Sequence, residues 1–370
     1  MKQNNTIDTF LALVRAGLWE KEVQIHPYGD VDFDGVLQLA EEQSTVGLVA
    51  AGIEHISDIK PQKKDVLQFI GQVTQLEQRN QAMNYFIGVM IDKMRLDNIY
   101  SLLVKGQGTA QCYARPLWRA CGDVDFLLSE DNYKSAKSFL TPMAESVEPE
   151  SGRHLGMTIG PWVVELHGDM HCGLSSRMDS VIDEVQKVIF YRGSVRSWFD
   201  GETQVFLPDA NSDAFLLFTH CLKHFYKGGL GLRQICDWCR LLWTYWDSID
   251  ITLLEQRLRR SGLTSEWRAF GSFVVEYIGM PSETVPLYSP QIKWKRKAKR
   301  ILKFIIMSGN FGHNRDSRYK QYPFIFKKFF AMTRRLRDLL NHATIFPLDS
   351  LRFLPRIMIN GINAAAKGIG

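Results

Sequence analysis

The chain has 370 residues, of which 45% are hydrophobic and 23% are charged, and its formal net charge is +5. This length allows two or three domains, and the composition is ordinary for a soluble globular protein with a sizeable core. The mild basicity, with a pI near 8.8, permits a polyanionic partner without requiring one.

Export and membrane spanning are both disfavoured by the sequence. The amino-terminal segment is charged and amphipathic, and no window reaches about 18 uninterrupted apolar residues. The six cysteines come without a signal peptide or a small disulfide framework, which predicts reduced thiols. We therefore expect a cytoplasmic protein with no transmembrane segment.

The first part of the chain is predicted to be helical. Apolar residues recur at helical spacing from Ile7 onward, and residues 65–94 contain no proline and only two glycines. A long helix over that range, packing on the next part of the chain, is expected. Residues 1–97 are interpreted as a helical N-terminal domain.

A strand is expected over residues 99–104, followed by a turn that carries Gly106 and Gly108. Glycines allow backbone N–H groups to approach an anion without a Cβ in the way. A second strand is expected over residues 123–128, and the capping residues after it predict a helix start at Ser129. Strands over residues 154–158 and 162–167, joined at Gly160-Pro161, complete a mixed sheet.

Three carboxylates are expected to meet on this sheet. Asp123 and Asp125 are two residues apart in one predicted strand, so both point to the same face. Glu165 lies in a second strand, with His167 on the same face. Carboxylate oxygens on one face suit a hard cation such as Mg²⁺ or Mn²⁺. Two solvated aspartates at a strand end are the alternative for the Asp-x-Asp pattern alone.

The remainder is expected to be mainly helical. Residues 168–183 look irregular, and residues 188–207 suit a hairpin or an edge strand. An apolar helix follows Pro208-Asp209, breaks at Gly228-Gly229 and resumes over residues 232–245. The fold class predicted is α+β: a small mixed β-sheet catalytic domain over residues 98–208, flanked by the helical N-terminal domain and a helical C-terminal domain over residues 209–370.

The order of these motifs resembles the polymerase-β-type nucleotidyltransferase superfamily, and more closely a bacterial group of uncharacterised nucleotidyltransferases. The resemblance rests on Lys105-Gly106, Arg119, the run Gly122-Asp123-Val124-Asp125-Phe126-Leu127-Leu128 and Glu165-Leu166-His167. It extends to the segments beginning at Gly231 and Gly309. The wider superfamily usually has Gly-Ser or Gly-Gly where this chain has Gly106-Gln107-Gly108. The resemblance implies metal aspartates at Asp123 and Asp125, a third carboxylate at Glu165 and the glycine turn at Gly106.

The resemblance also implies transfer of a nucleotidyl group. An acceptor hydroxyl attacks the α-phosphate of a nucleoside triphosphate and releases pyrophosphate, with Glu165 or a metal-bound hydroxide as the base. Residues beside the expected pocket are candidates for nucleotide binding, and these are Lys105, Gly106, Gly108, Arg119, His167, Arg233 and Asp237. Structural alternatives stay open: an ion pair of Arg119 with Asp123, a structural His167, and an i, i+4 pair of Arg233 with Asp237.

Two further patterns are weaker. The stretch from Lys293 to Lys303 carries seven Lys or Arg, with more basic residues at 327–328, 334–335 and 337. It predicts either a solvated helix face or a site for nucleic acid or an anionic membrane, where Trp294 would stack on bases. Cys221-x-x-His224 with Cys236-x-x-Cys239 has a zinc-like composition, but buried cysteines in helices explain it better. The acceptor, whether small molecule, RNA or protein, is left undefined, and a non-catalytic nucleotide- or nucleic-acid-binding protein is the alternative.

Overall fold

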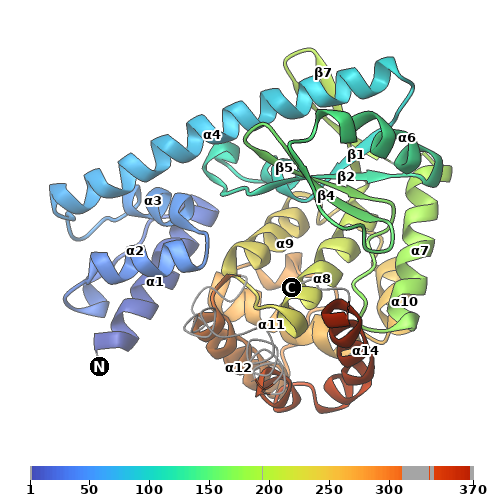
Figure 1. Cartoon of the computed structure of the whole chain (residues 1–370). Coiled ribbons are helices and arrows are strands. Elements are labelled where there is room, and N and C mark those ends of the chain that lie inside the picture. The colour runs from blue at the N-terminus through green and yellow to red at the C-terminus, as the bar shows by residue number, and fades with distance from the viewer. Residues whose placement is uncertain (1, 194, 311–332, 334–336, 367–370) are drawn as a thin grey trace. The chain divides into compact units, whose positions relative to one another are not determined.

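The computed structural model describes the backbone of residues 2–193, 195–310, 333 and 337–366, and side chains from residue 5 to residue 359 within those ranges. The chain divides into two compact units (Figure 1). The first comprises Met1–Met170 and Asp183–Ala214, and the second comprises His171–Ile182 and Phe215–Gly370. Within the described residues, no helix is both long enough and apolar enough to cross a membrane.

The first unit begins with four helices: α1 (Lys2–Trp19), α2 (Phe33–Glu42), α3 (Val46–Glu54) and α4 (Lys63–Leu96). Helix α3 packs against both α1 and the first half of α4. Gly17 and Gly52 allow α1 and α3 to approach closely, because a Cβ on either would meet the backbone of the other helix at 2.8 Å or less. The expected helical front segment and its long helix are confirmed.

A five-stranded mixed sheet follows, in the order β1-β2-β5-β4-β3. Its strands are β1 (Ser101–Val104), β2 (Asp123–Leu128), β3 (Ser146–Val147), β4 (His154–Ile159) and β5 (Trp162–His167). Strands β2 and β5 are parallel, and the other neighbours are antiparallel. Helix α5 (Gly106–Ala110) follows β1. Helix α6 (Glu130–Leu140) follows β2, and the Ser129 hydroxyl caps it by accepting from the Asn132 N–H.

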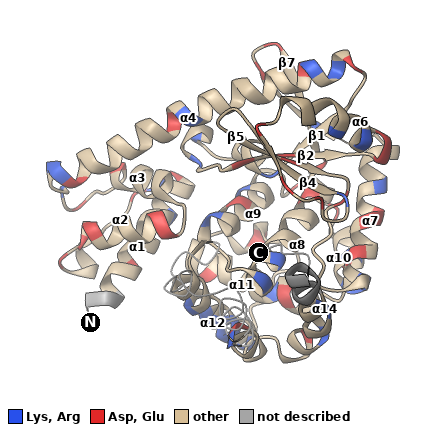
Figure 2. Ribbon diagram, viewed as in Figure 1, with Lys and Arg blue, Asp and Glu red and all other residues tan. Residues whose placement is uncertain are grey.

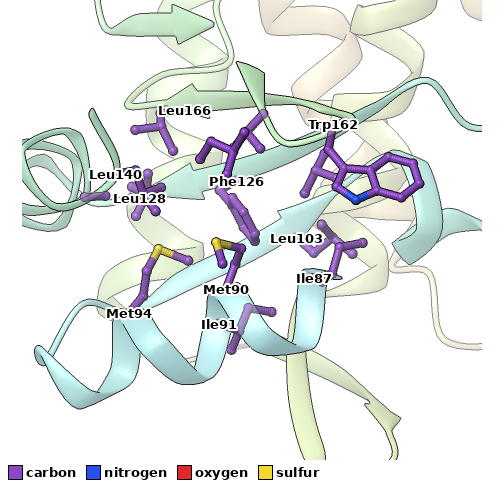
Figure 3. Packing of buried hydrophobic residues seen from close by; sticks show 14 of the residues in the cluster. Ile87, Met90, Ile91, Met94, Leu103, Phe126, Leu128, Leu140, Trp162 and Leu166 are labelled. Atoms are coloured by element: carbon purple, nitrogen blue, oxygen red, sulfur yellow. The ribbon is translucent and has the colours of Figure 1, made fainter. Parts of the chain in front are cut away.

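One face of the sheet packs against α4. Met83, Ile87, Met90, Ile91 and Met94 repeat at helical spacing and are at most 5% exposed. They meet alternate residues of the strands, including Leu103 and Phe126, as Figure 3 shows. This packing fixes which residues of β2 and β5 point away from α4, since side chains alternate between the two faces of a strand.

The segment between β5 and the last two strands differs from expectation. Residues 168–183 were expected to be irregular, but helix α7 (Ser176–Tyr191) begins within them. Ser175 caps it by accepting from the Met178 N–H, and the apolar series Met178, Ile182, Val185 and Ile189 is buried at helical spacing. The predicted hairpin is confirmed as β6 (Val195–Asp200) and β7 (Thr203–Pro208), which form a separate two-stranded sheet.

The second unit is helical where it is described. Its helices are the start of α7, α8 (Ala210–Lys227) from Phe215 onward, α9 (Leu232–Thr244), α10 (Ile251–Ser261), α11 (Thr264–Ile278), α12 (Ile292–Ser308) and α14 (Pro347–Ala366), and residues 337–343 are also helical. Aromatic rings fill its interior, with Phe218, Trp238 and Trp267 in mutual edge or tilted contacts. The helix-rich chain with a mixed sheet is consistent with the α+β class.

Candidate active site

The face of the sheet opposite α4 carries polar residues on three adjacent strands. On β2 the core takes Val124, Phe126 and Leu128, which leaves Asp123 and Asp125 on the other face. On β5 the core takes Trp162, Val164 and Leu166, so Glu165 and His167 share that same polar face. Figure 2 shows acidic segments on β2 and β5. The alternation predicted from the sequence is therefore present.

The parallel register of β2 and β5 brings the three predicted carboxylates together. In this register Asp125 lies directly opposite Glu165, and Asp123 lies opposite Val163, two residues earlier on β5. Single oxygens of Asp123, Asp125 and Glu165 all lie within 4.8 Å of one another. An all-oxygen donor set of this kind fits a hard divalent cation.

Lys105 enters this group from the end of β1. Its Nζ lies 2.7 Å from Oδ1 of Asp125, and both side chains are largely buried, at 13% and 2% exposure. Lys105 has φ 57° and ψ −147°, a backbone conformation that costs a residue with a side chain of order 1–3 kcal/mol. The following residue, Gly106, also has a positive φ, of 42°. The chain thus turns sharply at Lys105 and places its ammonium among the carboxylates.

Charge compensation decides the ionisation of this cluster. Burial would raise the pKa of Asp125, but the Lys105 ammonium and the hydrogen bond from His167 outweigh it and lower that pKa. The pKa of Glu165 is likewise lowered, despite burial, by hydrogen bonds with His154 and His167. For Lys105, burial is opposed by the charges of Asp125, Asp123 and Glu165, which raise its pKa. Both carboxylates and the ammonium are therefore charged at neutral pH.

Two histidines border the carboxylates. His167 Nε2 lies 2.7 Å from Oδ1 of Asp125 and 3.3 Å from Oε2 of Glu165. His154 Nε2 lies 3.1 Å from the same Glu165 oxygen. His154 was not among the residues predicted from the sequence. It lies opposite His167 in the antiparallel pair β4–β5, and this register would have identified it.

The predicted glycine turn is confined to Lys105 and Gly106, because α5 begins at Gly106 and includes Gly108. A Cβ on Gly108 would lie 2.7 Å from the Leu207 side chain of β7, so this glycine allows close packing there. Gln107 is 1% exposed, and its amide donates to Oδ1 of Asn80 on α4 at 2.8 Å. Gln107 thus ties α5 to α4.

Asn80 also positions the segment before β2. Its Nδ2 donates to the carbonyl oxygens of Leu117 and Arg119, at 2.7 and 2.9 Å. Arg119 is 4% exposed and follows the short 3-10 helix Pro116–Trp118. Its backbone is therefore fixed between α4 and β2, and its predicted contact with phosphate stays a prediction.

Arg233 and Asp237, also predicted to bind nucleotide, lie on α9 in the second unit. Arg233 Nη1 and Asp237 Oδ2 are 3.8 Å apart, as expected for an i, i+4 pair. The cysteines of α8 and α9 are buried, and burial raises the pKa of the Cys221 and Cys236 thiols. Across the described ranges, His, Cys, Asp and Glu side chains converge in two sets that could hold a metal, and neither contains cysteine.

The basic segment forms most of α12, where Figure 2 shows several Lys and Arg positions. Lys295 pairs with Glu276 at 2.7 Å, while Lys293, Arg296, Lys299 and Lys303 are exposed. Trp294 is only 6% exposed, so its ring does not offer a free surface for stacking. The further basic residues at 327–328 and 334–335, and Phe311-Gly312 of the segment beginning at Gly309, lie outside the described residues.

Comparison with known proteins gives one family. The model of the family described as "Uncharacterised nucleotidyltransferase" matches residues 29–278, which is more than half of the chain. This range contains every residue of the polar sheet face, together with α8, α9 and α11, and it ends before α12. No curated protein and no solved structure gives a match. The chain belongs to the uncharacterised nucleotidyltransferase family.

Proposed function

We propose that the protein is a divalent-cation-dependent nucleotidyltransferase of the polymerase-β type, which moves a nucleoside monophosphate from a nucleoside triphosphate to an acceptor hydroxyl. The observation that carries this proposal is the convergence of Asp123, Asp125 and Glu165 from two parallel strands. Family membership supports a transferase. Mg²⁺ or Mn²⁺ is the proposed cofactor.

In this proposal, Asp123, Asp125 and Glu165 hold the cation. When bound, it would neutralise charge on the triphosphate and on the oxygens that exchange at the α-phosphorus. Glu165 shares an all-oxygen set with Asp123 and Asp125, and its pKa is lowered by hydrogen bonds with His154 and His167, which supports the role of a charged ligand over that of a base.

The bond between the α-phosphorus and the oxygen bridging to the β-phosphorus breaks, and the acceptor oxygen forms the new bond. Pyrophosphate leaves, and water accepts the proton of the acceptor hydroxyl. The Lys105 ammonium lies 2.7 Å from Oδ1 of Asp125, and we assign it to binding of the triphosphate. Arg119 is a second candidate for binding a phosphate group, and Asn80 holds its backbone through a hydrogen bond to the Arg119 carbonyl oxygen. Roles for Arg233 and Asp237 are kept as predictions.

The test is transfer of label from each α-³²P nucleoside triphosphate, with Mg²⁺ or Mn²⁺, to size-fractionated cell extract. The wild type is compared with Asp123→Asn/Asp125→Asn and with Asp131→Asn, a matched control on the exposed first turn of α6. We expect transfer by the wild type and the control, and a loss of more than about 1000-fold in the double variant.

Two outcomes would overturn the proposal. One is equal transfer by the double variant, since the reaction would then not need the aspartates. The other is cation-dependent nucleotide binding by a folded wild type that transfers no label with any nucleotide. That result would favour a non-catalytic nucleotide-binding protein.

A further inference from the structure

The two histidines and Glu165 form a second convergent group beside the three carboxylates. His154 on β4 and His167 on β5 are direct cross-strand partners, and their ring centroids are 4.8 Å apart. Their Nε2 atoms lie 3.1 and 3.3 Å from the same oxygen, Oε2 of Glu165. One nitrogen from each ring thus contacts the same carboxylate oxygen.

The spacing of these atoms suits direct coordination. Zinc–nitrogen and zinc–oxygen bonds are about 2.0–2.2 Å long, so adjacent ligands of a tetrahedral site are separated by about 3.4 Å. The two nitrogen–oxygen separations, 3.1 and 3.3 Å, are within a few tenths of an ångström of that value, and one ligand atom from each of the three residues lies within 4.8 Å of the other two. His167 Nε2 also lies 2.7 Å from Oδ1 of Asp125, and binding of an ion to this nitrogen replaces that contact.

The chemistry of this group differs from that of the carboxylate set. Imidazole nitrogen favours transition metals over Mg²⁺, which prefers oxygen ligands and keeps its waters. Three protein ligands with further positions open is also the usual pattern of a zinc site that takes water or substrate. The Glu165 side chain is 26% exposed and that of His154 is 36% exposed, so an ion in solution has access.

We propose that His154, Glu165 and His167 form a transition-metal site, suited to Zn²⁺ or Co²⁺, that shares Glu165 with the three-carboxylate set. Asp123 and Asp125 belong to the oxygen set alone, and His154 belongs to the nitrogen-containing set alone. The inference goes beyond the transferase proposal, because it concerns metal binding that requires no nucleotide. It predicts that substitutions unique to each set affect different metals.

The experiment titrates the full-length apoprotein with Co²⁺, following the visible absorption of the bound ion, and with Mg²⁺ by calorimetry, both without nucleotide. Variants are His154→Ala, Asp123→Asn and the control His26→Ala, which removes an exposed histidine of the first unit. We expect His154→Ala to weaken Co²⁺ binding by more than about 100-fold and to leave Mg²⁺ binding within about twofold. Asp123→Asn should weaken Mg²⁺ binding and keep the Co²⁺ absorption.

Folding of His154→Ala is checked by circular dichroism, and His167→Ala serves as a second variant that should also lose the Co²⁺ absorption. Co²⁺ affinity unchanged in both histidine variants would overturn the inference, whatever the transferase assay gives. A histidine-dependent Co²⁺ absorption in a protein that transfers no nucleotide would support the metal site while the proposed function failed. The two proposals therefore fail separately.

Discussion

Each unit holds two neighbouring carboxyl groups that are at least partly buried, and their pKa values are shifted in opposite directions in the two units. In the first unit, Asp125 and Glu165 have lowered pKa values. In the second unit, Glu266 on α11 is completely buried, and burial together with the neighbouring carboxylate of Asp349 raises its pKa to about 8. The pKa of Asp349 is also raised by burial.

The difference lies in the contacting cations and hydrogen-bond donors. Asp125 has the Lys105 ammonium at 2.7 Å and an imidazole nitrogen at 2.7 Å. Glu266 has a long hydrogen bond from the Tyr226 hydroxyl, at 3.4 Å, and a side-chain hydrogen bond with the carboxyl group of Asp349, while Lys297 acts on it as a charge. Burial alone therefore does not decide whether a carboxyl group is charged; the contacting partner does. A charged cluster suits cation binding, whereas a protonated Glu266 suits helix packing.

The largest effect is expected from Lys105→Met, which leaves Asp125 buried without its cation. Breaking a buried ion pair typically costs about 3–5 kcal/mol of unfolding free energy. Urea unfolding at pH 7 measures the loss, and Mg²⁺ should restore more stability to the variant than it adds to the wild type. The exposed pair Lys134–Glu130 supplies the control, because Lys134→Met should cost less than about 0.5 kcal/mol. Equal losses in the two variants would contradict this account.

Glu266→Gln tests the second cluster through the pH dependence of stability. The pKa of Glu266 is about 8 in the folded state against 4.5 in the unfolded state, so folding favours the protonated form. Stability from this group is complete below pH 4.5 and falls as the pH rises through 8. We expect wild-type unfolding free energy to drop by about 3 kcal/mol between pH 5 and 8 relative to the variant. Exposed Glu283→Gln is the control, and parallel profiles for all three proteins would refute the assignment.

His167→Phe removes one of the two partners of Asp125 and keeps Lys105. A hydrogen bond to a charged group contributes about 1.5–3 kcal/mol, so the variant should lose roughly 2 kcal/mol at neutral pH. Its acid unfolding should also begin at higher pH. The pKa of Asp125 is lower in the folded state than in the unfolded state, so ionised Asp125 stabilises the fold above its unfolded-state pKa. This stabilisation is lost as the pH falls through the folded-state pKa, and without His167 the pKa is lowered less. Acid titration followed by tryptophan fluorescence measures the midpoint of acid unfolding. An unshifted midpoint would argue against a stabilising contact between His167 and Asp125.

The smallest effect is expected from Lys297→Met. Lys297 is half-buried against the Phe346 ring, and burial lowers its pKa. Because Glu266 is protonated at pH 7, removing this ammonium should cost less than about 1 kcal/mol, in contrast to Lys105→Met. Thermal unfolding of both lysine variants in one buffer makes the comparison. A loss from Lys297→Met as large as that from Lys105→Met would show that Glu266 is ionised.

The strands of the mixed sheet could be predicted from the sequence, because the patterns that indicate a strand or a helix cap are local. The alternation of residues 123–128 and 162–167, and the Ser129 cap, depend only on the pleat and on neighbouring backbone groups. Helix α7 was missed although its apolar series has helical spacing, because the preceding irregular segment obscured where it begins. The predicted glycine turn is too broad, since Gly108 lies inside α5 and its lack of a Cβ allows close packing against Leu207, a residue far away in the sequence.

The sequence by itself determined that Asp123 and Asp125 share one face of a strand and that Glu165 and His167 share one face of another. It also determined that a helical segment precedes them. Side-chain direction follows from the period of a strand or helix, and that period can be read from neighbouring residues. Only the tertiary structure decided that β2 and β5 are parallel neighbours, that His154 joins them through β4, and that Lys105 is an ion-pair partner of Asp125. Strand pairing joins residues far apart in the chain, and their register is set by which faces the α4 core buries.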